Sequence, residues 1–293
     1  MAGVVKTQNA IEIRNVTKHY KNFSLNKINF TVPTGTIMGF VGENGAGKTT
    51  TIKAILDLIN VEEGEVRVFG TDSRELDMDR KAQIGVVFDG SNLHDNMTVK
   101  DINFIMKNIY SNWEKEVFSS YLTRLQLPDD KILKDFSRGM KMKLSIAIAL
   151  SHKPKLLILD EATSGLDPIV RDEMLDIFLD FIQEEDHTIL LSSHIITDIE
   201  KIADYVTLIH KGSIIFSENK DELIYRHGII HCRKEDVAAI DRSYIVGIRE
   251  NIFGVDVMIR DKDAFQRRYH QFAFDKASIE EIMLFTIRGA FNH

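Results

Sequence analysis

Residues 42–50 carry the residue types that a protein needs to hold a chain of phosphate groups. They are Gly42, Glu43, Asn44, Gly45, Ala46, Gly47, Lys48, Thr49 and Thr50, which fit the pattern G-x-x-x-x-G-K-[ST]. Glycines let the backbone approach closely, so that successive N–H groups can point at phosphate oxygens. In this pattern Lys48 reaches the β- and γ-phosphates, and the Thr49 hydroxyl ligates Mg²⁺. The sequence therefore predicts a site for a nucleoside triphosphate with magnesium.

A second group of chemically active residues is the acidic pair Asp160 and Glu161, which follows the apolar run 156–159. Such a run is typical of a buried parallel strand, and ligands bind beyond the carboxyl ends of such strands. We expect Asp160 to hold Mg²⁺ opposite Thr49, directly or through water. We expect Glu161 to act as the general base toward an attacking water. An ordinary strand end is the alternative, but the upstream phosphate loop favours the catalytic interpretation.

The segments on either side of the phosphate loop have the patterns that would position it. Residues 37–41 form a short apolar run, as expected of a buried strand. After the loop, apolar residues recur at helical spacing, namely Ile52, Ile55, Leu56 and Ile59. The positive N-terminus of this predicted helix would meet the phosphates.

The overall composition is that of a globular protein with ample core. The chain has 293 residues, a net charge of −7 and 44% hydrophobic residues, so no broad nucleic-acid-binding surface is expected. No apolar stretch approaches the length of a membrane span, and the first residues lack the apolar core of a signal peptide. The single cysteine, Cys232, excludes an internal disulfide and suits a reducing cytosol.

The order of the motifs resembles that of the ATP-binding cassette (ABC) ATPases, and more narrowly the nucleotide-binding subunits of bacterial ABC-2-type exporters. Residues 136–140 resemble the family's signature sequence, 164–168 its D-loop, and 191–194 the segment that ends in its switch histidine, His194. Within the signature the residues are Ser137, Arg138, Gly139 and Met140. The resemblance covers roughly residues 8–224.

The resemblance implies roles for several of these residues. The signature would face the γ-phosphate bound by the other cassette of a head-to-tail dimer, and Ser137 also has the character of an ordinary helix cap. His194 would donate a hydrogen bond to the γ-phosphate. Tyr20 would stack on adenine, with plain packing as the alternative. The implied cofactors are ATP and Mg²⁺.

Two positions depart from the family pattern. Asp89 follows the apolar run 84–88, where the family usually has a glutamine that touches Mg²⁺ and the attacking water. Aspartate is shorter but can still contact the metal, and we expect it to do so. In the signature, Arg138 and Met140 replace the commonest glycine and glutamine. Because Lys48 and the acidic pair remain, hydrolysis should survive.

The expected fold is α/β: a P-loop NTPase (RecA-like) core with an antiparallel β subdomain, a helical signature subdomain and a small C-terminal α+β extension. The ABC ATPase domain is placed at 8–224, its helical subdomain at about 92–152, and an accessory region at 225–293. Alternating apolar residues predict antiparallel strands within 11–33 and at 66–68, and helical patterns span 99–109 and 113–126. We interpret Trp113 and Phe118 as helix-face packing. In the accessory region, strands are predicted near 229–232, 244–248 and 255–259, and a helix over 278–285.

The resemblance implies an ATP-hydrolysing subunit that powers export through a separate transmembrane permease. A second cassette, identical or paralogous, would complete the dimer. The permease would dock near Asp89 and the helical subdomain, at an exposed apolar groove near 89–110, which would hold this chain at the cytoplasmic face of the membrane. The alternatives are a soluble ABC ATPase that acts on DNA or ribosomes, and a regulator that hydrolyses ATP poorly.

Overall fold

The computed structural model describes residues 9–90 and 93–289, which divide into two compact units between Ser217 and Glu218. The boundary predicted from the sequence, after residue 224, falls inside α8 (Lys220–Arg226). In the structure α8 packs against two helices of the second unit, α10 (Lys262–Arg268) and α11 (Ile279–Gly289). The whole of α8 therefore belongs to the second unit.

The centre of the first unit is a six-stranded sheet with the order β10-β9-β3-β8-β7-β6. Its strands are β3 (Ile37–Val41), β6 (Ile84–Val87), β7 (Leu156–Asp160), β8 (Thr188–Ser193), β9 (Tyr205–His210) and β10 (Ser213–Asn219). Every residue of β3 and β7 is buried, because helices or a second sheet cover both faces of a parallel sheet. β3 and β7 both run parallel to β8. Their carboxyl ends therefore meet at one edge, where the phosphate loop and the acidic pair begin.

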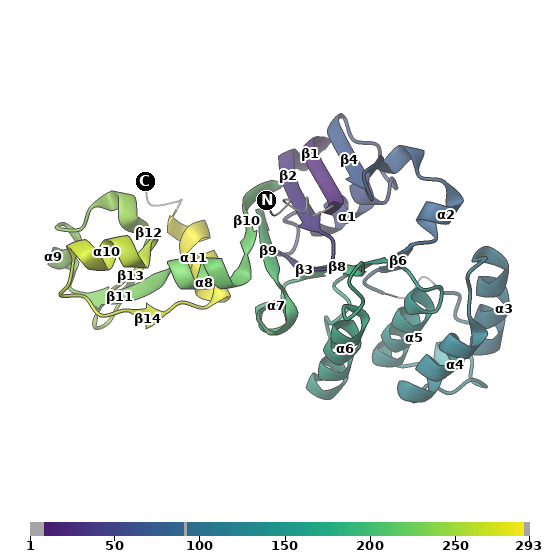
Figure 1. Cartoon of the computed structure of the whole chain (residues 1–293). Helices are drawn as coiled ribbons and strands as arrows, with labels where there is room; N and C mark the ends of the chain where they lie inside the picture. Colours follow the sequence, from purple (N-terminus) through teal and green to yellow (C-terminus); the bar gives the residue numbers. More distant parts are fainter. Residues whose placement is uncertain (1–8, 91–92, 290–293) are drawn as a thin grey trace, which may run out of the picture. The chain divides into compact units, whose positions relative to one another are not determined.

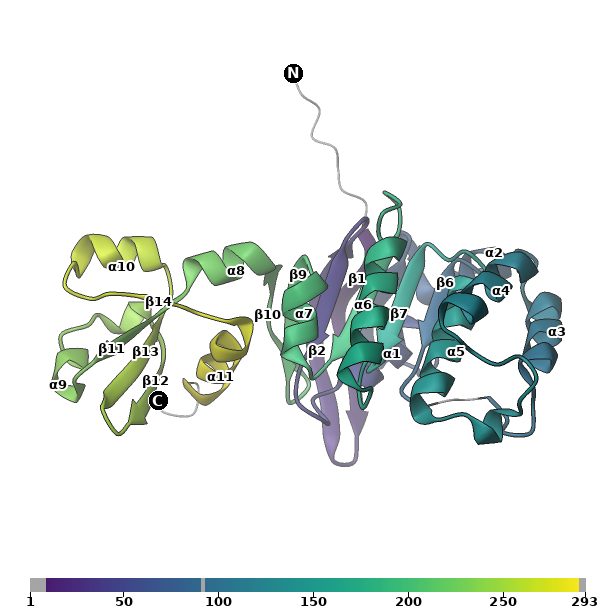
Figure 2. The same cartoon turned by 90° about the horizontal axis from the view of Figure 1, so that it is seen from below.

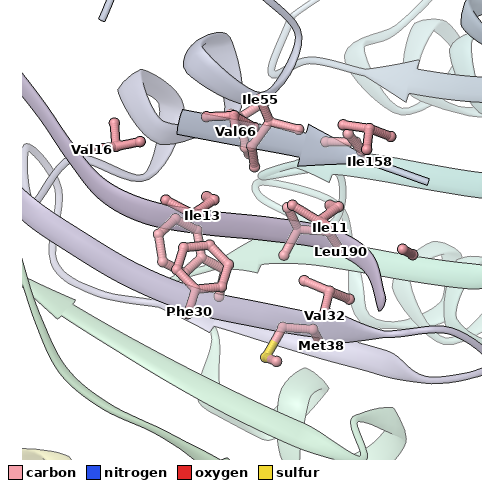
Figure 3. Packing of buried hydrophobic residues seen from close by; sticks show 14 of the residues in the cluster. Ile11, Ile13, Val16, Phe30, Val32, Met38, Ile55, Val66, Ile158 and Leu190 are labelled. Carbon is pink, nitrogen blue, oxygen red and sulfur yellow. The ribbon is translucent and has the colours of Figure 1, made fainter. Parts of the chain in front are cut away.

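An antiparallel sheet with the order β2-β1-β4-β5 packs on one face of the central sheet. Its strands are β1 (Asn9–Tyr20), β2 (Phe23–Pro33), β4 (Glu63–Val68) and β5 (Thr71–Asp72). Ile13 of β1 and Phe30 of β2 point into the same cluster as Met38 of β3, and Ile55 lies beside Val66 (Figure 3). The strands predicted from alternation within 11–33 and at 66–68 are confirmed.

Alternation along β3 separates the two faces of the central sheet. Met38 and Phe40 join the cluster beneath the antiparallel sheet, together with α1 (Lys48–Ile55). Gly39 points the other way: a Cβ atom there would lie 2.4 Å from Ile199 of α7 (Ile196–Ile202). Glycine at this position lets the helix approach closely. The other helices of the core are α2 (Met78–Lys81) and α6 (Pro168–Phe181).

Three helices form the predicted helical part: α3 (Val99–Ile109), α4 (Lys115–Arg124) and α5 (Arg138–Leu150), grouped together in Figure 1. Thr98 caps α3 in a capping box with Asp101. Trp113 and Phe118 are buried with ring centroids 5.1 Å apart, so both are packing residues. Phe118 lies on α4 as predicted, whereas Trp113 precedes this helix and is not on a helix face. Among the described residues, no helix has the length and apolar character needed to cross a membrane.

The second unit has its own four-stranded antiparallel sheet, with the order β12-β13-β11-β14. Its strands are β11 (Gly228–Cys232), β12 (Ile245–Asn251), β13 (Gly254–Ile259) and β14 (Asp275–Lys276), and a short helix α9 covers Lys234–Val237. Figure 2 shows α11 beside β12, where a Cβ on Gly247 would lie 2.5 Å from the Phe285 carbonyl oxygen. The three predicted strands and the helix after Ser278 are confirmed.

Candidate functional site

The phosphate loop joins β3 to α1 and contains glycines that its geometry requires. Gly45 and Gly47 have positive φ angles of 80° and 119°, a region that residues with a Cβ adopt rarely. A Cβ on Gly42 would lie 2.4 Å from the Ile209 carbonyl oxygen of β9. The loop therefore takes the wrapped form that the sequence predicts. Glu43, Asn44, Gly45 and Thr49 are exposed along it, and Thr50 is half-buried.

Lys48 folds back over this loop instead of extending into solvent. Its Nζ donates hydrogen bonds to the carbonyl oxygens of Gly42, at 2.7 Å, and Glu43, at 3.3 Å. The same Nζ lies 3.1 Å from Oε1 of Glu161 in an ion pair, and the lysine side chain is 6% exposed. A buried ammonium group is thus held at the place where the sequence predicts phosphate.

The Asp160 carboxylate is fixed by hydroxyl groups on both of its oxygens. Thr49 Oγ1 donates to Oδ2 at 2.7 Å, and Ser192 Oγ donates to Oδ1 at 2.9 Å. Asp160 is 2% exposed. The donor set fits Mg²⁺, which prefers oxygen ligands and is usually bound by one or two protein groups together with phosphates and water.

Glu161 has a backbone conformation that is unusual for its residue type. Its φ is +54°, which side chains with a Cβ seldom adopt and which is common at functional sites. The Glu161 amide donates to the Ser192 carbonyl oxygen at 3.0 Å. Its Oε2 lies 2.6 Å from Nδ1 of His194, while Oε1 faces Lys48. The structure therefore links the predicted base, the predicted histidine and the loop lysine through direct contacts.

The signature residues lie at the start of α5. Ser137 is the N-cap, and its hydroxyl accepts a hydrogen bond from the Met140 amide at 3.2 Å. Gly139 has open space around its Cα, since a Cβ there would meet its nearest neighbours at 3.8 Å. Arg138 Nη2 forms an ion pair of 2.9 Å with Oδ1 of Asp89. These residues form a second group, held by their own contacts.

Tyr20 lies at the end of β1 and presents its ring to solvent. The residue is 47% exposed, and Lys18 Nζ lies 5.6 Å from the ring centroid. An exposed ring is compatible with adenine stacking, which stays a prediction.

Two residues near the site were missed by sequence reasoning. Ser192 pairs with Asp160 in the register of β7 and β8, a relationship that needs the sheet order. Asp198 in α7 follows His194 closely and is buried, and this burial raises the pKa of its carboxyl group. In the sequence, Ser192 is marked only as a polar residue directly after the apolar run 189–191.

The sequence matches known proteins of one family. Residues 25–164 match the family described as ABC transporter. The chain is 37% identical over 220 residues to the bacitracin transport ATP-binding protein BcrA of Enterococcus faecalis, spanning 74% of this chain and 71% of that protein. The chain belongs to the ABC transporter ATP-binding proteins. It is 35% identical over 222 residues to the lantibiotic transport ATP-binding protein SrtF of Streptococcus pyogenes, spanning 73% of this chain and 95% of the relative.

Solved ABC structures share the fold. An ATP-binding subunit of an ABC transporter superposes with a TM-score of 0.67 at 24% identity, over 74% of this chain and 92% of the other. The ATP-binding cassette MJ0796, in a dimeric post-hydrolysis state with ADP and Pi, gives a TM-score of 0.63 at 22% identity, over 71% and 98%. The predicted P-loop fold is thereby confirmed.

Membership of the family also confirms the predicted activity. As an ABC ATPase the chain hydrolyses ATP to power transport through a separate membrane partner. ABC ATPases dimerise and pair with transmembrane permease subunits.

Proposed function

We propose that two cassettes of this kind close head to tail around two ATP–Mg²⁺ units, and that this closure drives an exporter in the membrane. The observation that carries the proposal is the chain of contacts from Lys48 through Glu161 to His194, at 3.1 Å and 2.6 Å. It joins the group that would bind phosphate to the group that would activate water. The signature at Ser137–Met140 would complete the site of the opposite cassette.

Glu161 is assigned as the general base. Its carboxylate would accept a proton from the attacking water. While Lys48 is paired with Oε1, this oxygen is less available to accept a proton from water. Phosphate oxygens would compete for the Lys48 ammonium group, because they are strong acceptors for a cation. Nucleotide binding would therefore release Oε1 for water.

His194 is assigned as the group that senses the γ-phosphate. A neutral imidazole donates from only one of its ring nitrogens. If Nδ1 donates to Glu161, as the 2.6 Å distance favours, Nε2 can donate to phosphate only when the ring is protonated. The alternative is that the ring leaves Glu161 when nucleotide binds. By either route, the hydrogen bonding of the Glu161 carboxylate would depend on whether the γ-phosphate is bound.

Mg²⁺ is assigned to Thr49 and Asp160. Thr49 Oγ1 lies 2.7 Å from Asp160 Oδ2, and Ser192 orients the Asp160 carboxylate. When bound, the ion would neutralise charge on the β- and γ-phosphates. Asp89 is the third predicted contact to the metal, and in the structure its carboxylate is paired with Arg138.

The membrane permease is assigned to the surface of α3 and the neighbouring end of α5. Phe104 is 71% exposed and Ile109 is 56% exposed on α3. A hollow of about 210 Å³ lies beside the signature, lined by Gly90, Phe136, Arg138, Lys141, Met142 and Ser145. Exposed apolar side chains such as Phe104 and Ile109 are what a partner helix would cover. Such a permease would hold the chain at the cytoplasmic face of the membrane.

The cargo is proposed by analogy with the relatives, whose names record transport of bacitracin and of a lantibiotic. Affinity purification of the full chain from membranes tests the class: a multi-span protein should co-purify. Cells that carry the pair should also tolerate more bacitracin or lantibiotic than cells that carry the Lys48→Ala variant. Recovery of the chain only with ribosomes or DNA would contradict the proposal.

A further inference from the structure

The two residues that depart from the common family pattern contact each other. Asp89 stands where a glutamine is usual, and Arg138 stands where a glycine is usual. In the structure Arg138 Nη2 lies 2.9 Å from Oδ1 of Asp89. Their charges are complementary, and each would lose its partner if the other had the usual uncharged side chain. The two departures therefore form one structural unit.

The Arg138 guanidinium also lies against the loop that follows Glu161. A Cβ atom placed on Gly165 would lie 2.8 Å from Arg138 Nη1 and 2.9 Å from its Cζ. Gly165 has a φ of +69°, so glycine is favoured there for its backbone as well. Arg138 thus connects the segment that follows β6, the first turn of α5 and the loop after β7. These three segments contain Asp89, the signature residues and the loop that follows Glu161.

A neighbouring ion pair shows what is particular about this arrangement. Lys141 Nζ, one turn further along α5, lies 2.6 Å from Oδ1 of Asp95. This ion pair lowers the pKa of the Asp95 carboxyl group. It joins α5 to the same segment after β6, whereas the three atoms nearest to a Cβ on Gly165 all belong to Arg138. The Asp95–Lys141 pair is therefore a matched control for the Asp89–Arg138 pair.

We infer that Asp89 is a positioning residue whose carboxylate holds the Arg138 guanidinium against Gly165. The cation is thereby fixed at the first turn of α5, beside Ser137 and Gly139, where it can meet a triphosphate held by the opposing cassette. This inference rests on the head-to-tail dimer of the proposed function. Arginine has many rotamers, and an exposed guanidinium without such support would seldom occupy this one place. Asp89 acts through Arg138, not by touching the nucleotide itself.

The test is a double-mutant cycle in the full chain with Glu161→Gln, which blocks hydrolysis. Dimerisation with ATP and Mg²⁺ is measured by sedimentation, and ATP binding to the monomer by fluorescence. Asp89→Asn should weaken dimerisation about two- to fivefold, the range for an exposed ion pair. Arg138→Met should weaken it about tenfold or more, because a cation near phosphate is lost. The double variant with Asp89→Asn and Arg138→Met should dimerise no more weakly than the variant with Arg138→Met alone.

Three comparisons decide between the inference and its rivals. Asp95→Asn should leave dimerisation within the error of the parent, and Asp89→Glu should restore part of what Asp89→Asn loses. ATP affinity of the monomer should be unchanged by Asp89→Asn at every Mg²⁺ concentration. If Asp89→Asn weakens Mg²⁺-dependent ATP binding to the same extent with and without Arg138→Met, Asp89 is a metal ligand and the inference is overturned.

A measurement on the monomer without nucleotide separates this inference from the proposed function. Amide hydrogen exchange at residues 163–167 should be faster in Asp89→Asn than in Asp95→Asn, because only the first releases Arg138 from Gly165. Equal exchange in the two variants overturns the positioning role, whether or not the parent dimerises. If the parent fails to dimerise while exchange differs as expected, the proposed dimer fails and the Asp89–Arg138–Gly165 contact stands.

Discussion

Thr49 and Asp160 are 111 residues apart in the sequence, and the Thr49 hydroxyl donates a 2.7 Å hydrogen bond to the Asp160 carboxylate. The contact is possible because β3 and β7 both pair with β8 and end at the same edge of the sheet. The two oxygen groups that the proposed function assigns to Mg²⁺ are thereby brought together. The acid is held in place from the other side by Ser192.

Removal of the Ser192 hydroxyl should weaken the proposed magnesium site. Ser192→Ala takes away a hydrogen bond to Oδ1 of Asp160, and groups that orient a metal ligand change metal affinity by about 10- to 100-fold. We expect the Mg²⁺ concentration for half-maximal ATPase activity to rise about tenfold. Ser193→Ala is the matched control, since the Ser193 hydroxyl bonds to the Ile195 backbone instead. Equal shifts in the two variants would argue against the assignment.

Replacement of Glu161 should separate binding from hydrolysis. Glu161→Gln keeps the size of the side chain but removes the base, so turnover should fall by about 10²–10⁴. Nucleotide binding, measured by fluorescence, should be retained. Glu65→Gln, which alters a carboxylate paired with Arg14 in the antiparallel sheet of β1 and β4, is the control and should hydrolyse ATP normally. A Glu161→Gln enzyme with wild-type turnover would refute the assigned base.

The second unit should show a pH-dependent contact at His231. Asp256 first, then Asp275, raises the pKa of this histidine by hydrogen bonding. Because the folded pKa is raised, the stabilisation is complete below about pH 6.5 and is lost as the pH rises through the folded value. An NMR titration of the full chain should give a His231 pKa above about 6.5. Asp256→Asn should lower it more than Asp275→Asn; the reverse order would contradict the geometry.

An exposed aromatic on α3 should matter for the complex but not for the isolated cassette. Phe104→Ala should weaken association with the permease about tenfold, as loss of a buried interface aromatic does. ATPase activity without the permease should stay unchanged, because Phe104 lies on the outer surface of α3. Leu58→Ala is the control, because Leu58 is also exposed but follows α1, outside the helical part formed by α3, α4 and α5. Co-purification yields from membranes give the comparison.

Local patterns made much of the fold predictable. The phosphate loop is a contiguous motif, and the strands within 11–33 and the helix after Thr98 follow from alternation and capping within a few residues. The position of the helical signature segment was also predicted, from the resemblance to ABC ATPases. For these features, the information lies close together along the chain.

Contacts between distant segments were not predictable in the same way. Ser192 supports Asp160 only because β7 and β8 pair in one register. The Asp89–Arg138 ion pair depends on how the ends of β6 and α5 are placed in the fold, which no local pattern predicts. The metal contact predicted for Asp89 stays a prediction. The division before α8 depends on helix packing, since no linker composition marks it.

The most direct test of the central claim is a cross-linking experiment between two differently labelled chains. Asn44→Cys marks the phosphate loop of one chain and Met140→Cys marks the signature of the other, both in a background of Glu161→Gln and Cys232→Ser. The mixture is treated with a short bismaleimide. With ATP and Mg²⁺ we predict cross-links that join one Asn44→Cys chain to one Met140→Cys chain, and none without nucleotide. The absence of such mixed cross-links, even with the permease present, would contradict the account.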